Sequence, residues 1–265
     1  MSMNKILFFL GLMIFSNLCG YAQKEDLNLH IYLLMGQSNM AGRGKITEEF
    51  KGLQHANVQM LDSNYKWVQA KHPVHFDKPK VAGVGPGLSF GIAMAEASPS
   101  VKIGLVPCAV GGTPISKWIP GAYDKATNTY PYDDAVKRIQ EAMKYGVVKG
   151  VIWHQGEANS GSEGSKTYIA KLTELINRVR TLVGNPQLPF VAGELGDFKL
   201  QYQNINNVLK ELPQKVVNTG VATSEGLKDK GDVTHFDGPS ADELGKRFAV
   251  KMIELQSAQK RESRK

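Results

Sequence analysis

The chain of 265 residues carries a formal net charge of +7, and 42% of its residues are hydrophobic, a share typical of globular proteins. Part of the positive charge lies in the last six residues, Lys260-Arg-Glu-Ser-Arg-Lys265, so we expect a frayed basic tail from about residue 257. No basic patch interleaved with aromatic residues is present in the sequence, which argues against nucleic acid as a partner.

The first 22 residues have the pattern of a secretory signal peptide. Lys5 precedes an apolar stretch over residues 6–15, and Gly20-Tyr-Ala22 has the small-residue spacing of a cleavage site. The stretch is too short to span a bilayer, and no later segment is long and apolar enough. A lipoprotein anchor at Cys19 is disfavoured, because Leu18 stands where a small residue is expected. We therefore expect a secreted or periplasmic protein in which residues 23–265 form a single domain.

Strand-like and helix-like patterns alternate along the rest of the chain. Strands are predicted at residues 31–36, 58–61, 101–110, 147–153, 188–195 and 216–222. Helices are predicted at residues 88–97, 132–145, 165–183 and 204–211, and a last helix is predicted to start with the capping box Ser240-Ala-Asp-Glu243. Residues 64–80, which include two prolines, are predicted to run over the surface. This alternation predicts an α/β fold with parallel strands and helices on both faces. Cys108 lies in one of the apolar runs and is predicted to be a buried, inert thiol.

Unusual polar segments follow three of the predicted strands, and a fourth precedes the last helix. They are Gly36-Gln-Ser-Asn39, Gly111-Gly-Thr113, His154-Gln-Gly-Glu157 with Asn159, and Asp232-Val-Thr-His235. Each has an ordinary explanation on its own, as a helix cap, a turn or a packed histidine. Because the carboxyl ends of parallel strands meet at one edge of a sheet, we expect the segments to surround one crevice.

The residue types in these segments suit ester hydrolysis. Ser38 is a candidate nucleophile, and a neutral His235 could take its proton. Asp232, three residues earlier, could hold the imidazole in the required tautomer, with Glu157 as the rival carboxylate. The N–H of Gly112 and the amide of Gln155 could bind the oxyanion. A metal site formed by His72, His75 and Asp77 is conceivable, but their spacing fits no strong ligand pattern, so neither a metal nor a cofactor is expected.

Together, these motifs resemble the SGNH-type esterases of the sialate O-acetylesterase and acetylxylan esterase group, the sixth carbohydrate-esterase family. The resemblance extends over nearly the whole mature chain. It implies a three-layer α/β/α sandwich with a flavodoxin-like parallel sheet, a serine esterase mechanism, and acetyl groups on sugars as the substrate class. In its motifs Ser38 matches the nucleophile, His235 the base and Asp232 the orienting acid, while Ser38 N–H, Gly112 and Gln155 match the oxyanion hole. The first motif lacks Gly-Asp-Ser, and the third has His-Gln-Gly-Glu instead of Gly-x-Asn-Asp, which leaves Asn159 as an alternative amide donor.

The leading functional prediction is a secreted carbohydrate O-acetylesterase acting on acetylated xylan, with an acetylated polysaccharide or oligosaccharide as substrate. Sialate O-acetylesterase is the nearest alternative, because the same motifs serve both substrates. A non-catalytic carbohydrate-binding module is the alternative from another class, with aromatic residues such as Tyr65, Trp67 and Phe76 lining a glycan surface. The intact set of catalytic residues favours the enzyme. The motifs set no oligomeric state.

Overall fold

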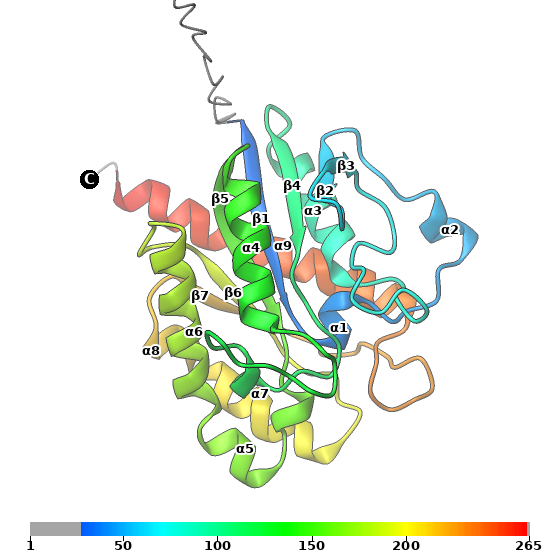
Figure 1. The fold of residues 1–265 in the computed structure, drawn as a ribbon, viewed down its shortest axis with the longest axis vertical. Helices are drawn as coiled ribbons and strands as arrows, with labels where there is room; N and C mark the ends of the chain where they lie inside the picture. Colours follow the sequence, from blue (N-terminus) through cyan, green and yellow to red (C-terminus); the bar gives the residue numbers. More distant parts are fainter. Residues whose placement is uncertain (1–27, 264–265) are drawn as a thin grey trace, which may run out of the picture.

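A computed structural model describes residues 28–263, and these form a central sheet of seven strands in the order β3-β2-β4-β1-β5-β6-β7 (Figure 1). All neighbouring strands are parallel except β2 and β3. The signal peptide and Cys19 lie outside the described residues. The strands are β1 Leu29–Gly36, β2 Val58–Leu61, β3 Trp67–Gln69, β4 Lys102–Pro107, β5 Val147–His154, β6 Phe190–Gly193 and β7 Thr219–Ala222.

Helices cover both faces of this sheet, so the predicted three-layer α/β/α architecture is confirmed. α3 and α9 pack together on one face, and α4 and α6 cover the other (Figure 1). The helices are α1 Ser38–Ala41, α2 Glu48–Lys51, α3 Pro86–Ala97, α4 Pro131–Met143, α5 Ser162–Lys166, α6 Tyr168–Leu182, α7 Gln203–Lys210, α8 Leu212–Lys215 and α9 Gly238–Glu262, with short 3₁₀ turns η1 Ile115–Lys117, η2 Glu157–Asn159 and η3 Leu200–Tyr202. No helix within residues 28–263 has the length and apolar character needed to cross a membrane.

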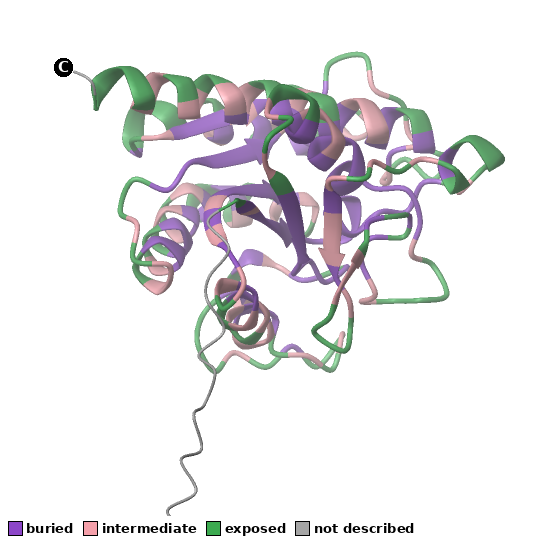
Figure 2. Cartoon of the chain, turned by 90° about the horizontal axis from the view of Figure 1, so that it is seen from above, coloured by how far each residue is buried: buried purple, intermediate pink, exposed green. Residues whose placement is uncertain are grey.

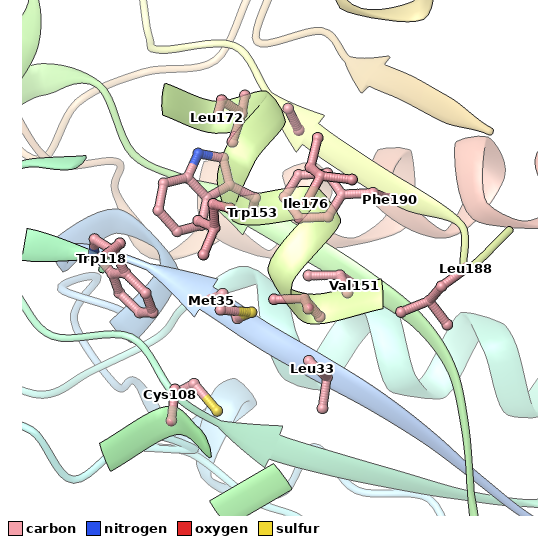
Figure 3. Packing of buried hydrophobic residues seen from close by; sticks show 14 of the residues in the cluster. Leu33, Met35, Cys108, Trp118, Val151, Trp153, Leu172, Ile176, Leu188 and Phe190 are labelled. Carbon is pink, nitrogen blue, oxygen red and sulfur yellow. The ribbon is translucent and has the colours of Figure 1, made fainter. Parts of the chain in front are cut away.

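The central strand β1 feeds two separate hydrophobic cores because its side chains alternate between the two faces. Ile31, Leu33 and Met35 pack on the side of α4 and α6, whereas Tyr32 and Leu34 pack on the side of α3 and α9. Figure 2 shows the resulting buried sheet between its helical layers, and Figure 3 shows Leu33 and Met35 with Cys108, Trp118 and Trp153 of the first core. Burial on both faces explains why the strand reads as a continuous apolar run.

Burial also accounts for the behaviour predicted for Cys108. The residue is fully buried as a free thiol, and burial raises its pKa to about 12. The predicted burial is therefore confirmed, and a raised pKa disfavours the thiolate that nucleophilic attack requires.

Four local predictions need correction. The predicted excursion over residues 64–80 contains the antiparallel edge strand β3, and the predicted helix over 165–183 is two helices, α5 and α6. The last helix is capped by Asp237, whose carboxylate accepts the N–H of Ser240, so the Ser240 capping box is wrong. Pro239 in the first turn suits this earlier start, because its fixed φ is helical. The basic residues from 257 are helical as far as Glu262 instead of a frayed tail.

The strand order creates a switch point at the carboxyl end of β1. The connection that leaves β1 runs past β4 to β2, whereas the connections that leave β4 and β5 run the other way, to β5 and β6. Open α/β sheets bind ligands at such a point. The segments that follow β1, β4 and β5 are the three polar segments singled out in the sequence.

Candidate active site

Ser38 is the first residue of α1, immediately beyond the carboxyl end of β1. Gly36 has φ +133°, and a side chain at this position would collide with the carbonyl group of His154 on β5, so only glycine fits the turn. The Gln37 N–H then donates to the same His154 carbonyl over 2.9 Å, which ties the turn to β5. The strand end therefore holds Ser38 at the sheet edge, where the residue remains 7% exposed.

His235 lies between Ser38 and Asp232 in one hydrogen-bonded chain. Its Nε2 is 3.0 Å from Ser38 Oγ, and its Nδ1 is 2.7 Å from Asp232 Oδ2. Burial acts to raise the pKa of Asp232, but hydrogen bonds from the backbone and ring of His235 outweigh it and hold this pKa well below its ordinary value. An ionised acceptor at Nδ1 leaves Nε2 free of its proton and able to accept the serine proton.

A strained turn presents this acid and base. Asp232 Oδ1 accepts the N–H groups of Thr234 and His235 over 3.1 and 2.8 Å, and Val233 between them has φ +49°. A β-branched residue rarely adopts this left-handed conformation, which persists only where surrounding contacts impose it. The turn therefore fixes Asp232 against the imidazole by local contacts.

Glu157, the rival carboxylate, bonds Asn39 and makes no hydrogen bond with His235 within the described residues. Its Oε1 accepts the amide N–H of Asn39 over 2.6 Å, and the same Nδ2 donates to Thr234 O over 3.0 Å. Asn39 Oδ1 in turn accepts the N–H of Phe236 over 3.1 Å. Asn39 thus joins the nucleophile helix to both sides of His235, and Glu157 supports Asn39.

Gly112 carries a backbone donor in the turn that follows β4. It has φ +91°, and among the described atoms only Lys78 Nζ lies within 4 Å of the point that a Cβ would occupy, so this side of the residue is open. No hydrogen bond between described residues uses the N–H of Gly112 or that of Ser38. Both donors are therefore free to bind a developing negative charge.

The structure changes the role predicted for Gln155. Its fully buried Nε2 donates to Gln37 Oε1 over 3.0 Å and to Asn159 Oδ1 over 2.8 Å, and lies 3.4 Å from Thr113 O. An amide nitrogen has two protons, so none is left for a substrate. Gln155 instead connects the residues that adjoin Ser38 and Gly112 to Asn159.

Asn159, unlike Gln155, has an amide NH2 group that no described hydrogen bond uses. Its Oδ1 accepts the backbone N–H of Ile115 over 3.0 Å, which fixes the oxygen on that side and leaves Nδ2 on the other. The residue is partly exposed, and no hydrogen bond between described residues uses its Nδ2. Asn159, which the sequence analysis named as the alternative amide donor, therefore has a free amide N–H. Gln155 connects it to the segments that contain Ser38 and Gly112.

The histidines considered as metal ligands are buried apart from any ligand set. Burial lowers the pKa of His72 and of His75 to about 4, against the opposing charges of Asp242 and Asp77 respectively. Asp77 binds Arg43 and the N–H of Gly111 instead of a histidine. No group of three or more His, Cys, Asp or Glu side chains in residues 28–263 is arranged to hold a metal ion.

The aromatic residues proposed to line a glycan surface do not form one continuous face. Tyr65 is 41% exposed, but Trp67 packs against the hydrophobic core and Phe76 lies beneath the guanidinium of Arg138. Other exposed tyrosines, Tyr123 and Tyr130, stack with ring centroids 5.1 Å apart in the loop before α4. Both tyrosines lie outside the four polar segments, so the sequence gave no reason to consider them as part of a glycan surface.

Sequence analysis assigned no role to Gln37, Asn39 or Arg43, although the structure places all three around the nucleophile. Gln37 and Asn39 flank Ser38 in the first motif, so their position was a usable signal. Arg43 lies four residues after the end of this motif, and its partner Asp77 lies in a segment predicted as surface loop. The contact between segments this far apart has no signature in one sequence.

A family model described as carbohydrate esterase, sialic acid-specific acetylesterase, matches residues 28–254. An Arabidopsis thaliana protein named as a probable carbohydrate esterase is 30% identical over 234 residues, which cover 81% of this chain and 86% of the relative. The crystal structure of an Arabidopsis thaliana protein that is also 30% identical superposes with a TM-score of 0.76, covering 86% of this chain and 99% of the other.

Two more distant structures share the fold. NanS superposes with a TM-score of 0.71 at 15% identity, covering 89% of this chain and 99% of its own. A carbohydrate acetylesterase from Xanthomonas citri gives a TM-score of 0.67 at 20% identity, covering 85% of this chain and 56% of the other. The three-layer architecture is thus common to proteins whose sequences have diverged widely.

Proposed function

The chain belongs to the sialic acid-specific acetylesterase family of carbohydrate esterases, and from this premise we propose that it removes O-acetyl groups by a Ser38–His235–Asp232 mechanism. The observation that carries the proposal is the continuous hydrogen-bonded chain from Ser38 Oγ through the imidazole to Asp232, with contacts of 3.0 and 2.7 Å. A hydroxyl, a base and an orienting carboxylate in this order generate a nucleophile near neutral pH.

The reaction proceeds through an acetyl-enzyme. Ser38 Oγ attacks the acetyl carbonyl carbon while His235 Nε2 takes the hydroxyl proton, and a tetrahedral oxyanion forms. His235 then returns the proton to the sugar oxygen, the ester C–O bond breaks, and the deacetylated sugar leaves. A water molecule, deprotonated by the same Nε2, attacks the acetyl-enzyme, and acetate leaves as Ser38 recovers its proton.

The oxyanion is stabilised by the N–H groups of Ser38 and Gly112 together with the amide of Asn159. All three donors are free in the described part of the chain, and Gln155 connects the segments that carry them. Because these donors are held before the reaction begins, they need not reorganise as charge develops. Gln155 is accordingly a positioning residue, which differs from the donor role predicted for it.

We propose acetylated xylan as the substrate because the catalytic groups lie at an open edge. The side chains of His235 and Asp232 are 23% and 38% exposed. An acetyl group inside a polysaccharide chain can reach a nucleophile only where both neighbouring sugars have room. An exposed acid–base pair provides that room, whereas a deep pocket accepts only small sugars.

An O-acetylated sialic acid is the second candidate, favoured by the description of the matching family model. A non-catalytic binding module is disfavoured because it would need neither the aligned proton path nor free oxyanion donors. The deciding experiment measures acetate released from acetylated xylan, mannan, pectin and O-acetylated sialic acid, with Ser38→Ala as the control. Fastest release from xylan supports the proposal, fastest release from sialic acid selects the second candidate, and no release from any substrate or from an aryl acetate refutes the esterase mechanism.

We further propose that the enzyme is exported, on the basis of the signal-peptide pattern in residues 1–22. Expression of the full chain in a bacterial host should yield a periplasmic or extracellular protein whose N-terminal sequence begins at Gln23. A product retained in the cytoplasm with residue 1 still present would contradict export. A lipidated Cys19 at the mature N-terminus would instead select the lipoprotein alternative.

A further inference from the structure

A buried ion pair connects the end of the nucleophile helix to the glycine turn that carries an oxyanion donor. Arg43 Nη2 and Asp77 Oδ2 are 2.8 Å apart, and their side chains are 5% and 2% exposed. Burial acts to raise the pKa of Asp77, but the guanidinium of Arg43 outweighs it and holds this pKa below its ordinary value, so the carboxylate is ionised. A strong buried acceptor therefore lies within the fold, outside the catalytic triad.

The same carboxylate oxygen also holds the backbone of the glycine turn. The N–H of Gly111 donates to Asp77 Oδ2 over 2.8 Å, and a Cβ at Gly111 would collide with Arg43 Nη2. Only a glycine allows the guanidinium to approach this closely. Asp77 therefore holds the peptide between Val110 and Gly111, and the next N–H in the chain is the free donor of Gly112.

Hydrogen bonds continue from this point to the nucleophile without a gap. Arg43 Nη1 donates to Gly42 O over 2.7 Å, and the N–H of Gly42 donates to Ser38 O over 2.9 Å. Ser38 and the glycine turn follow different strands, which are joined as far as Val110, whose N–H donates to Gly36 O over 3.1 Å, and the ion pair adds a link beyond that point. This link is rigid, because both partners are packed and charged.

We infer that Asp77 is a positioning residue of the esterase, which aims the Gly112 N–H at the oxyanion by holding the N–H of Gly111. Arg43 keeps the carboxylate ionised and ties it to the nucleophile helix. The inference rests on the proposed function, since it needs Gly112 to be an oxyanion donor. It assigns Asp77 a role in the chemistry, unlike a purely stabilising ion pair.

Testing this inference requires removing the acceptor without leaving a buried charge unpaired. Asp77→Ala alone would strand the guanidinium and destabilise the fold, whereas exchanging both partners for apolar residues is often tolerated. We therefore compare Arg43→Met/Asp77→Leu with Arg43→Met/Asp77→Asn. Leucine and asparagine have nearly the same shape, so the two variants differ in whether an oxygen can accept the N–H of Gly111.

The readout is kcat and KM for an aryl acetate in variants shown by circular dichroism and Tm to be folded. We expect kcat of the leucine variant to be about 10-fold to 100-fold below that of the asparagine variant, with KM within about threefold, since losing a whole oxyanion donor costs at least that much. Equal kcat values in the two folded variants would overturn the inference. Arg180→Met is the matched control, because this buried arginine binds carbonyl groups of Leu188 and Val217, away from the site, and should lose stability without losing kcat.

A second measurement needs no substitution and stays informative if a variant fails to fold. In amide hydrogen exchange on the wild-type enzyme, Gly111 should exchange slowly, and Gly112 should become protected only after a phosphonate has bonded to Ser38. Exchange of Gly111 at the rate of an exposed amide would overturn the inference. The proposed function fails separately, if the wild-type enzyme releases no acetate or if Ser38→Ala still does.

Discussion

Replacing Asp232 by asparagine should nearly abolish turnover by changing which nitrogen of His235 carries the proton. Asp232 Oδ2 now accepts the Nδ1 proton over 2.7 Å, and Nε2 faces Ser38 Oγ over 3.0 Å. If the asparagine NH2 replaces this oxygen, it donates to Nδ1, so the ring proton moves to Nε2. His235 then presents a proton to Ser38 and cannot take one.

The expected loss follows from the exposure of this pair. Loss of the orienting carboxylate in a serine triad lowers kcat by about ten-thousandfold through the wrong tautomer. The side chain of Asp232 is 38% exposed here, so water can reach Nδ1 and partly restore the correct tautomer. We therefore expect a decrease in kcat of about a thousandfold, which is about 4 kcal/mol in the activation barrier.

Glu157→Gln is the matched comparison, because the rival carboxylate occupies an equally distinctive motif. Glutamine keeps an oxygen for the Asn39 amide, which is 2.6 Å from Glu157 Oε1, and its NH2 group takes the place of Oε2, which has no hydrogen-bond partner among the described residues. The variant loses only the charge from one hydrogen bond, so we expect about 1 kcal/mol of lost stability and kcat within about tenfold of wild type.

Both variants are assayed with an aryl acetate for kcat and KM, and by denaturant unfolding for stability. We expect Asp232→Asn to be the slow but stable enzyme and Glu157→Gln to be the active but less stable one. A well-folded Glu157→Gln enzyme without turnover, beside an active Asp232→Asn enzyme, would reverse the assignment of the orienting carboxylate.

Four further outcomes are expected. Ser38→Ala should lose nearly all esterase activity at an unchanged Tm, and an organophosphate should label Ser38 in the wild type; substantial turnover by the alanine variant would refute the nucleophile. Asn159→Ala should lower kcat about a hundredfold with little change in KM. Gln155→Ala should lower both kcat and Tm, because the Gln155 amide connects three segments. A normal kcat in Asn159→Ala would mean that Gln155 is the amide donor. Prolonged treatment with EDTA should leave activity intact, and a loss that zinc restores would require a hydrolytic metal site. Burial lowers the pKa of His72 and of His75 from 6.5 to about 4, so the unfolded chain binds protons before the folded protein does as the pH falls. In urea titrations the free energy of unfolding should be highest above about pH 6.5 and should fall by roughly 2 kcal/mol per histidine between pH 7 and pH 5. Equal free energies of unfolding at both pH values would contradict this.

Much of the fold could be predicted because β1, β4 and β5 are buried on both faces and therefore appear as apolar runs. The edge strand β3 was missed for the opposite reason, since its residues are partly exposed and lie among prolines and polar residues. The start of α9 was misplaced because Asp237 and Ser240 are both good caps, three residues apart. The choice between them is made by tertiary contacts, in which Ser240 Oγ accepts the N–H of Lys228.

In the site, too, contacts between residues close in the sequence were predictable, whereas most contacts between distant residues were not. Asp232 and His235 lie within one turn, so their spacing alone predicted the pair. Ser38 is 197 residues from His235, and only the parallel topology of the sheet predicted that they would meet. The predicted donor role of Gln155 does not fit the structure because both of its amide protons bond other side chains. These acceptors are Gln37, which follows β1, and Asn159, in the turn η2.

This division explains why the residues that hold the site escaped a reading of the sequence, whereas those that carry the chemistry did not. Nucleophile, base and oxyanion donor must each be of a particular chemical type, so their segments are distinctive. A residue such as Asn39 or Asp77 needs only to reach the right backbone group, and its type becomes informative once its partners are known. Asn39 sets the distance from the nucleophile helix to His235, and Asp77 sets the distance to the glycine turn. The precision of the site therefore depends in part on polar side chains whose function is visible only in three dimensions.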